Sequence, residues 1–347
     1  MGSRIQADAT QEEYEDLLLK NPNLGFLAVV KRRAEDGTML DDFYLRAGVY
    51  DLELQESKRQ YFKSLESFDF NIAISQFVPS QLPIPNAFKI AGELETIPIE
   101  IIETTPASIL ANSEDLSSLE NTANQISLIN PLKYVATRPL IGGISVGHHR
   151  IVNPGTLGSK INLQTDGKYF LSNYHVLCGR IGGLGDKIIQ PSSHDGGTSP
   201  KDDVADLYWY KLDTYTDAAI GRILPGIKID PGTKCFQISG QTVAQCYMSV
   251  KKCGRTTNQT FGTVLSIKAT VKVGGYPSGI RTFKNQIQTK ITAQGGDSGS
   301  ILCEAETNKA VGLLFASDSQ GKYANHLHYI RGLSGGNSKP NISIMGF

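Results

Sequence analysis

The sequence lacks a long apolar run, a paired-cysteine motif and an excess of charge of either sign. No stretch approaches the roughly 18–20 consecutive apolar residues of a membrane-spanning helix, and the polar, acidic N-terminus is unlike a secretory signal. The five cysteines are an odd number and form no Cys-x-x-Cys pair, which argues against a zinc site and against a disulfide framework. We therefore expect free or buried thiols, no membrane span, no bound metal and a reducing, cytoplasmic location.

The net charge of zero conceals an unequal distribution along the 347 residues. Residues 1–137 contain 11 Lys and Arg against 21 Asp and Glu, whereas residues 138–347 contain 23 against 13, so the two parts carry −10 and +10. Glycine divides at the same place, with 5 in the first part and 30 in the second. Because hydrophobic residues make up an ordinary 40% of the chain, it can bury a sizeable core. The sequence predicts two unlike domains.

The first part predicts a small acidic α+β domain over residues 1–103. Thr10 and Glu13 form a capping-box pattern, which predicts a helix from Thr10 to about Lys20. Runs typical of strands follow at 26–31, 43–54, 70–78 and 97–102, and residues 56–67 have the pattern of an amphipathic helix. Residues 104–137 are rich in Ser, Thr and Asn and predict a linker.

The second part, residues 138–347, has a different texture. Short β-rich runs alternate with turns rich in Gly, Asn, Asp and Pro, and no long helical pattern occurs. This alternation is typical of β-barrels and β-sandwiches. We expect a mainly β fold here.

The stretch Gly295-Gly296-Asp297-Ser298-Gly299-Ser300 is the most informative in the chain. Glycines allow the backbone to turn tightly, so that successive N–H groups point into one small space. Such donors can stabilise the oxyanion of a tetrahedral intermediate formed by a nucleophilic serine. A plain polar turn between two strands is the alternative interpretation.

A serine hydroxyl needs a base to become a good nucleophile. His175 is the best candidate, because it follows an apolar strand and a polar turn, although a hydrogen-bonded histidine at a strand end is the structural alternative. The base needs a carboxylate to orient it. Asp203 and Asp217 each precede small apolar residues that could anchor such a group in a strand, so both are candidates.

Taken together, these motifs resemble the trypsin/chymotrypsin-like serine proteases. His175, the Asp217-Ala218-Ala219-Ile220 segment and Gly-Gly-Asp-Ser-Gly-Ser occur in the family's order, and 42 and 81 residues separate His175, Asp217 and Ser298. Other stretches resemble a mainly bacterial, non-secreted branch of the family. They are the segments 138–145, 155–158, 195–198 and 252–257.

The resemblance covers about residues 138–345 and implies a chymotrypsin-like double β-barrel, with barrels over roughly 138–228 and 229–347. It implies that Ser298 is the nucleophile and His175 the base. It favours Asp217 over Asp203 as the carboxylate, because 28 residues after His175 leave little room for the intervening strands. The N–H groups of Gly296 and Ser298 would bind the oxyanion, and no metal or cofactor is needed.

The resemblance also implies where a substrate binds. Thr292 would form the pocket floor, and since it has no carboxylate to select Lys or Arg, we expect a small or modestly polar P1 side chain. Phe315, Ala316 and Ser317 would form the edge that pairs with the substrate backbone. Cleavage before Ile141 could release an ammonium group for Asp297, but an intact strand at this position is the favoured interpretation.

The function that follows is that of a serine endopeptidase acting on a protein or peptide. A catalytically inactive scaffold of the same fold is the alternative. Nucleic-acid binding through Lys251, Lys252 and Arg255 is a third interpretation, which scattered solubilising charge explains equally well. Since complementary charge guides association, the acidic first domain is expected to dock on the basic protease domain and to regulate it. Two solvated faces without a functional contact are the alternative.

Overall fold

A computed structural model describes residues 3–34, 36, 38–63, 81–89, 96–110, 135–163, 167–330 and 343–344. The strand expected over 70–78 lies outside these residues, and so do residues 111–134 of the expected linker. Strands predominate in the described ranges, so the mainly β fold class is confirmed. In the same ranges, no helix combines the length and apolar composition needed to cross a bilayer.

The first part of the chain forms an α+β module in which α1 packs on a sheet. Its elements are α1 (Arg4–Leu18), β1 (Leu24–Arg33), β2 (Met39–Val49), α2 (Leu52–Lys63), β3 (Ala87–Lys89) and β4 (Thr96–Glu103). The capping box of α1 is formed by Ser3 and Gln6, whose side chains each accept the other's backbone N–H. Thr10 lies inside the helix and donates to the Gln6 carbonyl, so the predicted helix start was wrong.

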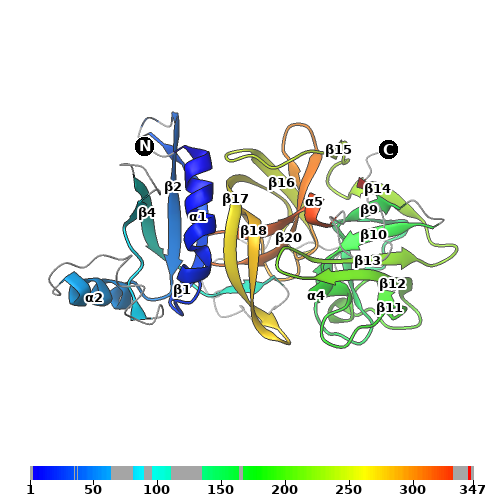
Figure 1. Ribbon diagram of the computed structural model, residues 1–347. Coiled ribbons are helices and arrows are strands. Elements are labelled where there is room, and N and C mark those ends of the chain that lie inside the picture. The colour runs from blue at the N-terminus through cyan, green and yellow to red at the C-terminus, as the bar shows by residue number, and fades with distance from the viewer. Residues whose placement is uncertain are drawn as a thin grey trace, which may run out of the picture.

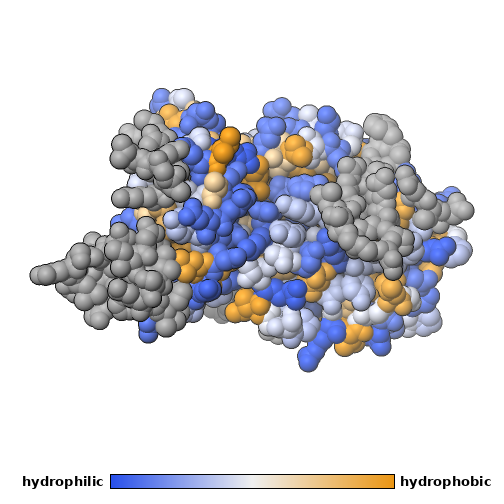
Figure 2. Space-filling view, in the orientation of Figure 1, coloured by the Kyte–Doolittle hydropathy of each residue, from blue (hydrophilic) through white to orange (hydrophobic). Residues whose placement is uncertain are grey.

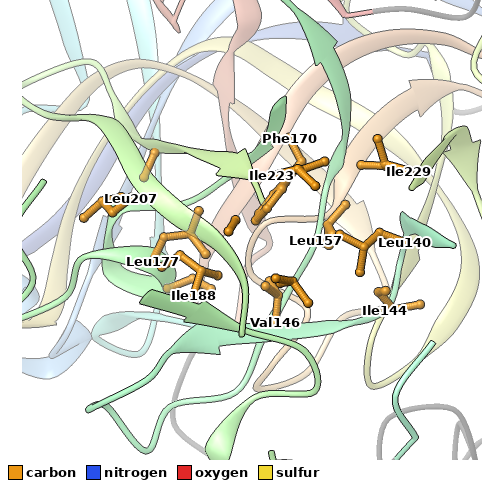
Figure 3. Packing of buried hydrophobic residues seen from close by; sticks show 14 of the residues in the cluster. Leu140, Ile144, Val146, Leu157, Phe170, Leu177, Ile188, Leu207, Ile223 and Ile229 are labelled. Atoms are coloured by element: carbon orange, nitrogen blue, oxygen red, sulfur yellow. The ribbon is translucent and has the colours of Figure 1, made fainter. Parts of the chain in front are cut away.

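A second group of elements forms an eight-stranded sheet with the order β22-β9-β10-β13-β12-β11-β7-β8. Its strands in chain order are β7 (Ser145–His148), β8 (Gly155–Thr156), β9 (Ser159–Asn162), β10 (Tyr169–Ser172), β11 (Lys187–Ile189), β12 (Asp203–Leu212), β13 (Asp217–Ile223) and β22 (Ser343–Ile344), and the short helices α4 (Tyr174–Leu177) and η5 (Ser193–Asp195) lie between them along the chain. The strands β6 (Leu140–Gly142) and β14 (Ile229–Thr233) pair with each other in a separate two-stranded sheet. The apolar side chains of Leu157, Phe170 and Ile223 converge in the core of the eight-stranded sheet (Figure 3).

The remaining strands join a twelve-stranded sheet with the order β16-β19-β20-β21-β18-β17-β1-β2-β4-β3, to which β5 and β15 are attached. The new elements are β5 (Ala107–Ile109), β15 (Gly240–Gln241), β16 (Ser249–Gly254), β17 (Asn258–Tyr276), β18 (Gly279–Ile291), β19 (Ile301–Glu304), β20 (Lys309–Ser317), β21 (Lys322–His326) and α5 (Leu327–Ile330). In Figure 1 the blue module, the yellow and orange strands and the green strands follow one another across the molecule.

The acidic module and the basic part of the chain share one sheet. β1 pairs antiparallel with β17, with Phe26 opposite Val271. Beside this pairing, Lys268 Nζ lies 2.8 Å from Glu12, and Lys284 Nζ lies 2.7 Å from both Glu15 and Asp16. In Figure 2 the surface along the junction of α1 with β17 and β18 is largely hydrophilic. Backbone pairing and opposite charges therefore join the two parts.

The cysteines differ from the expectation of five free thiols. Cys235 and Cys253 form a disulfide, and their Cα atoms are 6.0 Å apart. Cys178, Cys246 and Cys303 are free. The two bonded residues are 18 apart in the sequence and belong to no recognisable motif, so only the fold shows that they meet. With two cysteines bonded, the cysteines no longer support a reducing location, and that location stays a prediction.

Candidate active site

His175 and Asp217 meet because the strands that carry them are neighbours. β10 leads into the short helix α4, which presents His175, and β10 pairs with β13, whose first residue is Asp217. The His175 Nδ1 atom lies 2.6 Å from Asp217 Oδ2, and the His175 backbone N–H donates to Asp217 Oδ1 over 3.2 Å. Both side chains are buried. A carboxylate on Nδ1 leaves Nε2 as the free ring atom, the tautomer needed in a general base.

Asp217 has further partners that the sequence did not reveal. The Tyr276 hydroxyl donates to Asp217 Oδ2, the Asp217 N–H donates to the Asn325 side chain, and the Asn173 amide donates to the Asp217 carbonyl. Burial and the neighbouring Asp217 carboxylate raise the pKa of Tyr276 well above its usual value, so it remains a donor. Tyr276 comes from β17 and Asn325 from β21, both distant in sequence from Asp217.

Asp203, the other candidate carboxylate, lies elsewhere. It opens β12, where it pairs with Ile189, whereas the opposite end of β12, Leu212, pairs with Asp217. Nine residues of strand span about 30 Å at ~3.3 Å per residue. Of the two candidates, Asp217 is the one that contacts His175.

Ser298 stands in the tight loop between β18 and β19. Gly296 and Gly299 have positive φ values of +92° and +94°, which L side chains rarely adopt. A Cβ on Gly299 would also lie 2.2 Å from the Thr156 carbonyl oxygen and 2.4 Å from Ser172 Oγ. The loop therefore lies directly against the end of β10, from which His175 follows.

A buried carboxylate, Asp297, fixes the shape of this loop. It pairs with Lys252 Nζ at 3.2 Å and accepts bonds from the N–H groups of Gln294, Thr256 and Thr257. Burial alone would raise the pKa of Asp297, but the Lys252 charge and these donors outweigh it and lower the pKa. An internal lysine thus neutralises Asp297 without a newly released N-terminus.

The structure also bears on the strand expected at Ile141 and on the basic patch expected at Lys251, Lys252 and Arg255. Ile141 lies inside the intact strand β6, as the favoured interpretation had it. The basic patch of Lys251, Lys252 and Arg255 is not on the surface, because all three side chains are buried. Lys252 pairs with Asp297 and Arg255 with Asp195. The patch therefore offers no site for nucleic acid.

The Ser298 hydroxyl donates to the Phe315 carbonyl over 3.3 Å. Among the described residues, His175 Nε2 is buried without a hydrogen-bond partner. A hydrogen bond between the Ser298 hydroxyl and His175 is therefore not formed in this conformation. Such bonds are often long or absent until a substrate is bound.

A segment of the chain itself contacts the loop that carries Ser298. We call residues 105–110, which include β5, the cleft segment. β5 pairs antiparallel with β20, with Ser108 opposite Ser317, and parallel with β17 on its other side. The Leu110 N–H donates to the Phe315 carbonyl over 3.0 Å, and the Leu110 carbonyl accepts the Gly296 N–H over 2.5 Å. The cyan strand in Figure 1 marks its course.

The expected substrate-binding residues separate into two groups. Phe315, Ala316 and Ser317 lie on β20 and pair with the cleft segment, so this edge does bind an extended backbone. Thr292 is exposed, whereas the cluster of buried apolar side chains around Leu110 contains its neighbours Ile291 and Ala293. The Gly296 N–H donates to the Leu110 carbonyl, and the assignment of Gly296 and Ser298 to an oxyanion site stays a prediction.

The other histidines are engaged elsewhere. His148, His149 and Asp186 have ligand atoms within 4.8 Å of one another. Arg150 donates to the same Asp186 oxygen that His148 contacts, so this carboxylate already belongs to an ion pair. His326 contacts the Ile267 carbonyl, and burial lowers its pKa to about 4.

Comparisons with known proteins give structural but no sequence matches. No protein-family model matches the chain, and a search of curated proteins finds no match. Among solved structures, Thermobifida fusca protease A is 18% identical, with 55% of this chain and 94% of that chain covered and a TM-score of 0.42. A Nocardiopsis protease is 17% identical, with 55% of this chain and 94% of that chain covered and a TM-score of 0.42. Cellulomonas bogoriensis chymotrypsin is 21% identical, with 55% of this chain and 93% of that chain covered and a TM-score of 0.41. These neighbours are chymotrypsin-like serine proteases.

Proposed function

We propose that this protein is a serine endopeptidase in which Ser298 attacks a peptide carbonyl. The observation that carries the proposal is the buried His175–Asp217 pair beside a glycine loop whose Gly296 N–H binds a peptide carbonyl. His175 takes the Ser298 proton and passes it to the leaving amine, while Asp217 holds the ring and stabilises its charged form. The N–H groups of Gly296 and Ser298 stabilise the oxyanion, and water resolves the acyl-enzyme.

The chemistry requires one movement. Ser298 Oγ must turn from the Phe315 carbonyl towards His175 Nε2, which has no competing partner among the described residues. A serine hydroxyl makes such a turn by rotating about its Cα–Cβ bond from one staggered position to another. The Asp297 ion pair keeps the loop backbone in place while the hydroxyl turns.

Covalent labelling tests the proposal on the full chain. A fluorophosphonate should add one adduct to Ser298, measured by intact mass and peptide mapping. Ser298→Ala should take up none, and Ser300→Ala, which changes a neighbouring serine of the same loop, should still be labelled. Absence of an adduct on wild-type protein, together with no hydrolysis of a peptide library, would show instead a catalytically inactive scaffold.

We also propose that the acidic module regulates the site. β4 of this module leads directly into the cleft segment, and the Gln320 side chain, in the turn after β20, donates to the Glu103 carbonyl. Lys284→Glu should repel Glu15 and Asp16 and loosen the junction. Peptidase activity should then rise and become less sensitive to salt. Unchanged activity at every ionic strength would contradict a regulatory role.

A further inference from the structure

The cleft segment lies in the site as a substrate would, and this deepens the proposed function on which it rests. Both backbone groups of Leu110, its N–H and its carbonyl, form hydrogen bonds with residues of the site. The Phe315 carbonyl accepts the Leu110 N–H and also the Ser298 hydroxyl, while the Gly296 N–H binds the Leu110 carbonyl. Groups that flank Ser298 therefore bracket Leu110. The Leu110 carbonyl oxygen lies on the proposed oxyanion donor, and the Leu110 N–H shares its acceptor with the Ser298 hydroxyl.

We propose that the peptide bond on the carboxyl side of Leu110 is a self-cleavage site, and that the enzyme prefers an aliphatic P1 residue. In the first step, Ser298 Oγ bonds to the Leu110 carbonyl carbon and His175 takes the hydroxyl proton. The C–N bond then breaks, and the leaving amine takes that proton. In the second step, water attacks the ester, gives a proton through His175 to Ser298 Oγ, and releases Leu110 with a free carboxylate.

The surroundings of the Leu110 side chain set the preference. Leu110 is 4% exposed and belongs to an apolar cluster that includes Ile291, Ala293 and Leu314. The members of that cluster are uncharged aliphatic side chains. A charged P1 residue would be buried there without a partner, which is strongly unfavourable. This replaces the expectation of a small or modestly polar P1 residue.

The pairing on both sides explains why the segment reaches this position. β20 and β17 each contribute backbone bonds to β5. Thr105 and Ser319 exchange two hydrogen bonds between backbone N–H groups and hydroxyls, at 3.1 and 3.0 Å. The segment thus enters the site in one register, which puts Leu110, rather than Ile109, on the Gly296 N–H.

The test follows purified full-length chain over time by intact mass and N-terminal sequencing. We expect one cut, giving a fragment that ends at Leu110 and another that begins at Ala111. Ser298→Ala should stay intact. Leu110→Asp should be cut at least about 100-fold more slowly, yet should hydrolyse an external peptide with Leu before a reporter amine faster than Ser298→Ala. Leu184→Asp, at a leucine that is 67% exposed, should be cut like wild type.

Three results would overturn this inference while leaving the proposed function intact. They are a wild-type chain that stays whole but hydrolyses external peptides, a cut at another bond, and a preference for Lys or Asp over Leu at P1 by the 100-fold margin. In the first of these cases, faster hydrolysis of external peptides by Leu110→Asp would show that the uncleaved cleft segment blocks the site. A chain that is neither cut nor labelled by fluorophosphonate, and hydrolyses no peptide, overturns both proposals.

Discussion

The ion pair between Lys252 and Asp297 should control both stability and the reactivity of Ser298. Both side chains are fully buried, and Lys252 Nζ also donates to the Thr257 hydroxyl and the Asn258 carbonyl. Lys252→Met keeps an unbranched side chain that is one atom shorter, and it removes the charge. It leaves the buried Asp297 carboxylate without its paired cation, and breaking a buried pair in this way costs about 3–5 kcal/mol.

The structure suggests a value near the lower end of this range. Asp297 keeps the N–H donors of Gln294, Thr256 and Thr257, and the Thr257 hydroxyl donates to it over 2.6 Å. These donors stabilise a carboxylate even without a cation. We therefore expect Lys252→Met to lower the free energy of unfolding by about 3 kcal/mol.

Urea unfolding and the rate of fluorophosphonate labelling measure the two effects. Labelling should slow by about tenfold or more, because only ~1.4 kcal/mol of the loss needs to act on the loop conformation to give that factor. Lys251→Met is the matched control, since Lys251 donates to the Ala305 carbonyl and contacts no carboxylate in the described structure. Its expected cost is below about 1.5 kcal/mol. Unfolding within ~1 kcal/mol of wild type and unchanged labelling of Lys252→Met would refute this reasoning.

Four further outcomes are expected. Tyr276→Phe removes a buried donor to Asp217 and should lower kcat about tenfold with little change in KM, at a cost of ~1.5 kcal/mol. Asp217→Ala should lower kcat by about 10⁴-fold, and an equal loss in Asp203→Ala would contradict the assignment. The pKa of Asp297 is lower in the folded state than in the unfolded state. Its carboxylate therefore stabilises the fold at a pH above the unfolded pKa, and this stability is lost as the pH falls through the folded pKa. Asp297→Asn should thus flatten the fall in the free energy of unfolding below about pH 4. Lys284→Glu should lower the urea midpoint, less so in 1 M salt.

The position of the candidate catalytic residues could be predicted because local sequence and strand order determine it. A strand followed by a polar turn presents His175, and Asp217 opens the strand that pairs with it. The glycines around Ser298 were informative for a similar local reason, since Gly296 and Gly299 have the positive φ values that the turn requires. In each case the signal lay within a few residues of the group concerned.

The partners of these residues could not be predicted, because they come from distant strands. Tyr276 has the pattern of an ordinary strand aromatic, and only the fold brings its hydroxyl to Asp217. Lys252 looked like part of a solvent-exposed basic run, yet its ion pair with Asp297 requires that it be buried. The sequence around a charged residue in a strand does not reveal a partner carboxylate that comes from a distant part of the chain.

The cleft segment is the part of the described structure that the sequence pattern predicted least well. β5 has three residues, too few for an alternating pattern to be distinguished from a linker rich in Ser and Thr. Its conformation depends on open edges of β17 and β20, which exist only once the second part of the chain has folded. The module before it contributes Phe26 and Val30 to the apolar cluster that contains Ala107 and Ile109. What looked like a spacer between an acidic and a basic domain is therefore a strand held by both, with Leu110 against the Gly296 N–H.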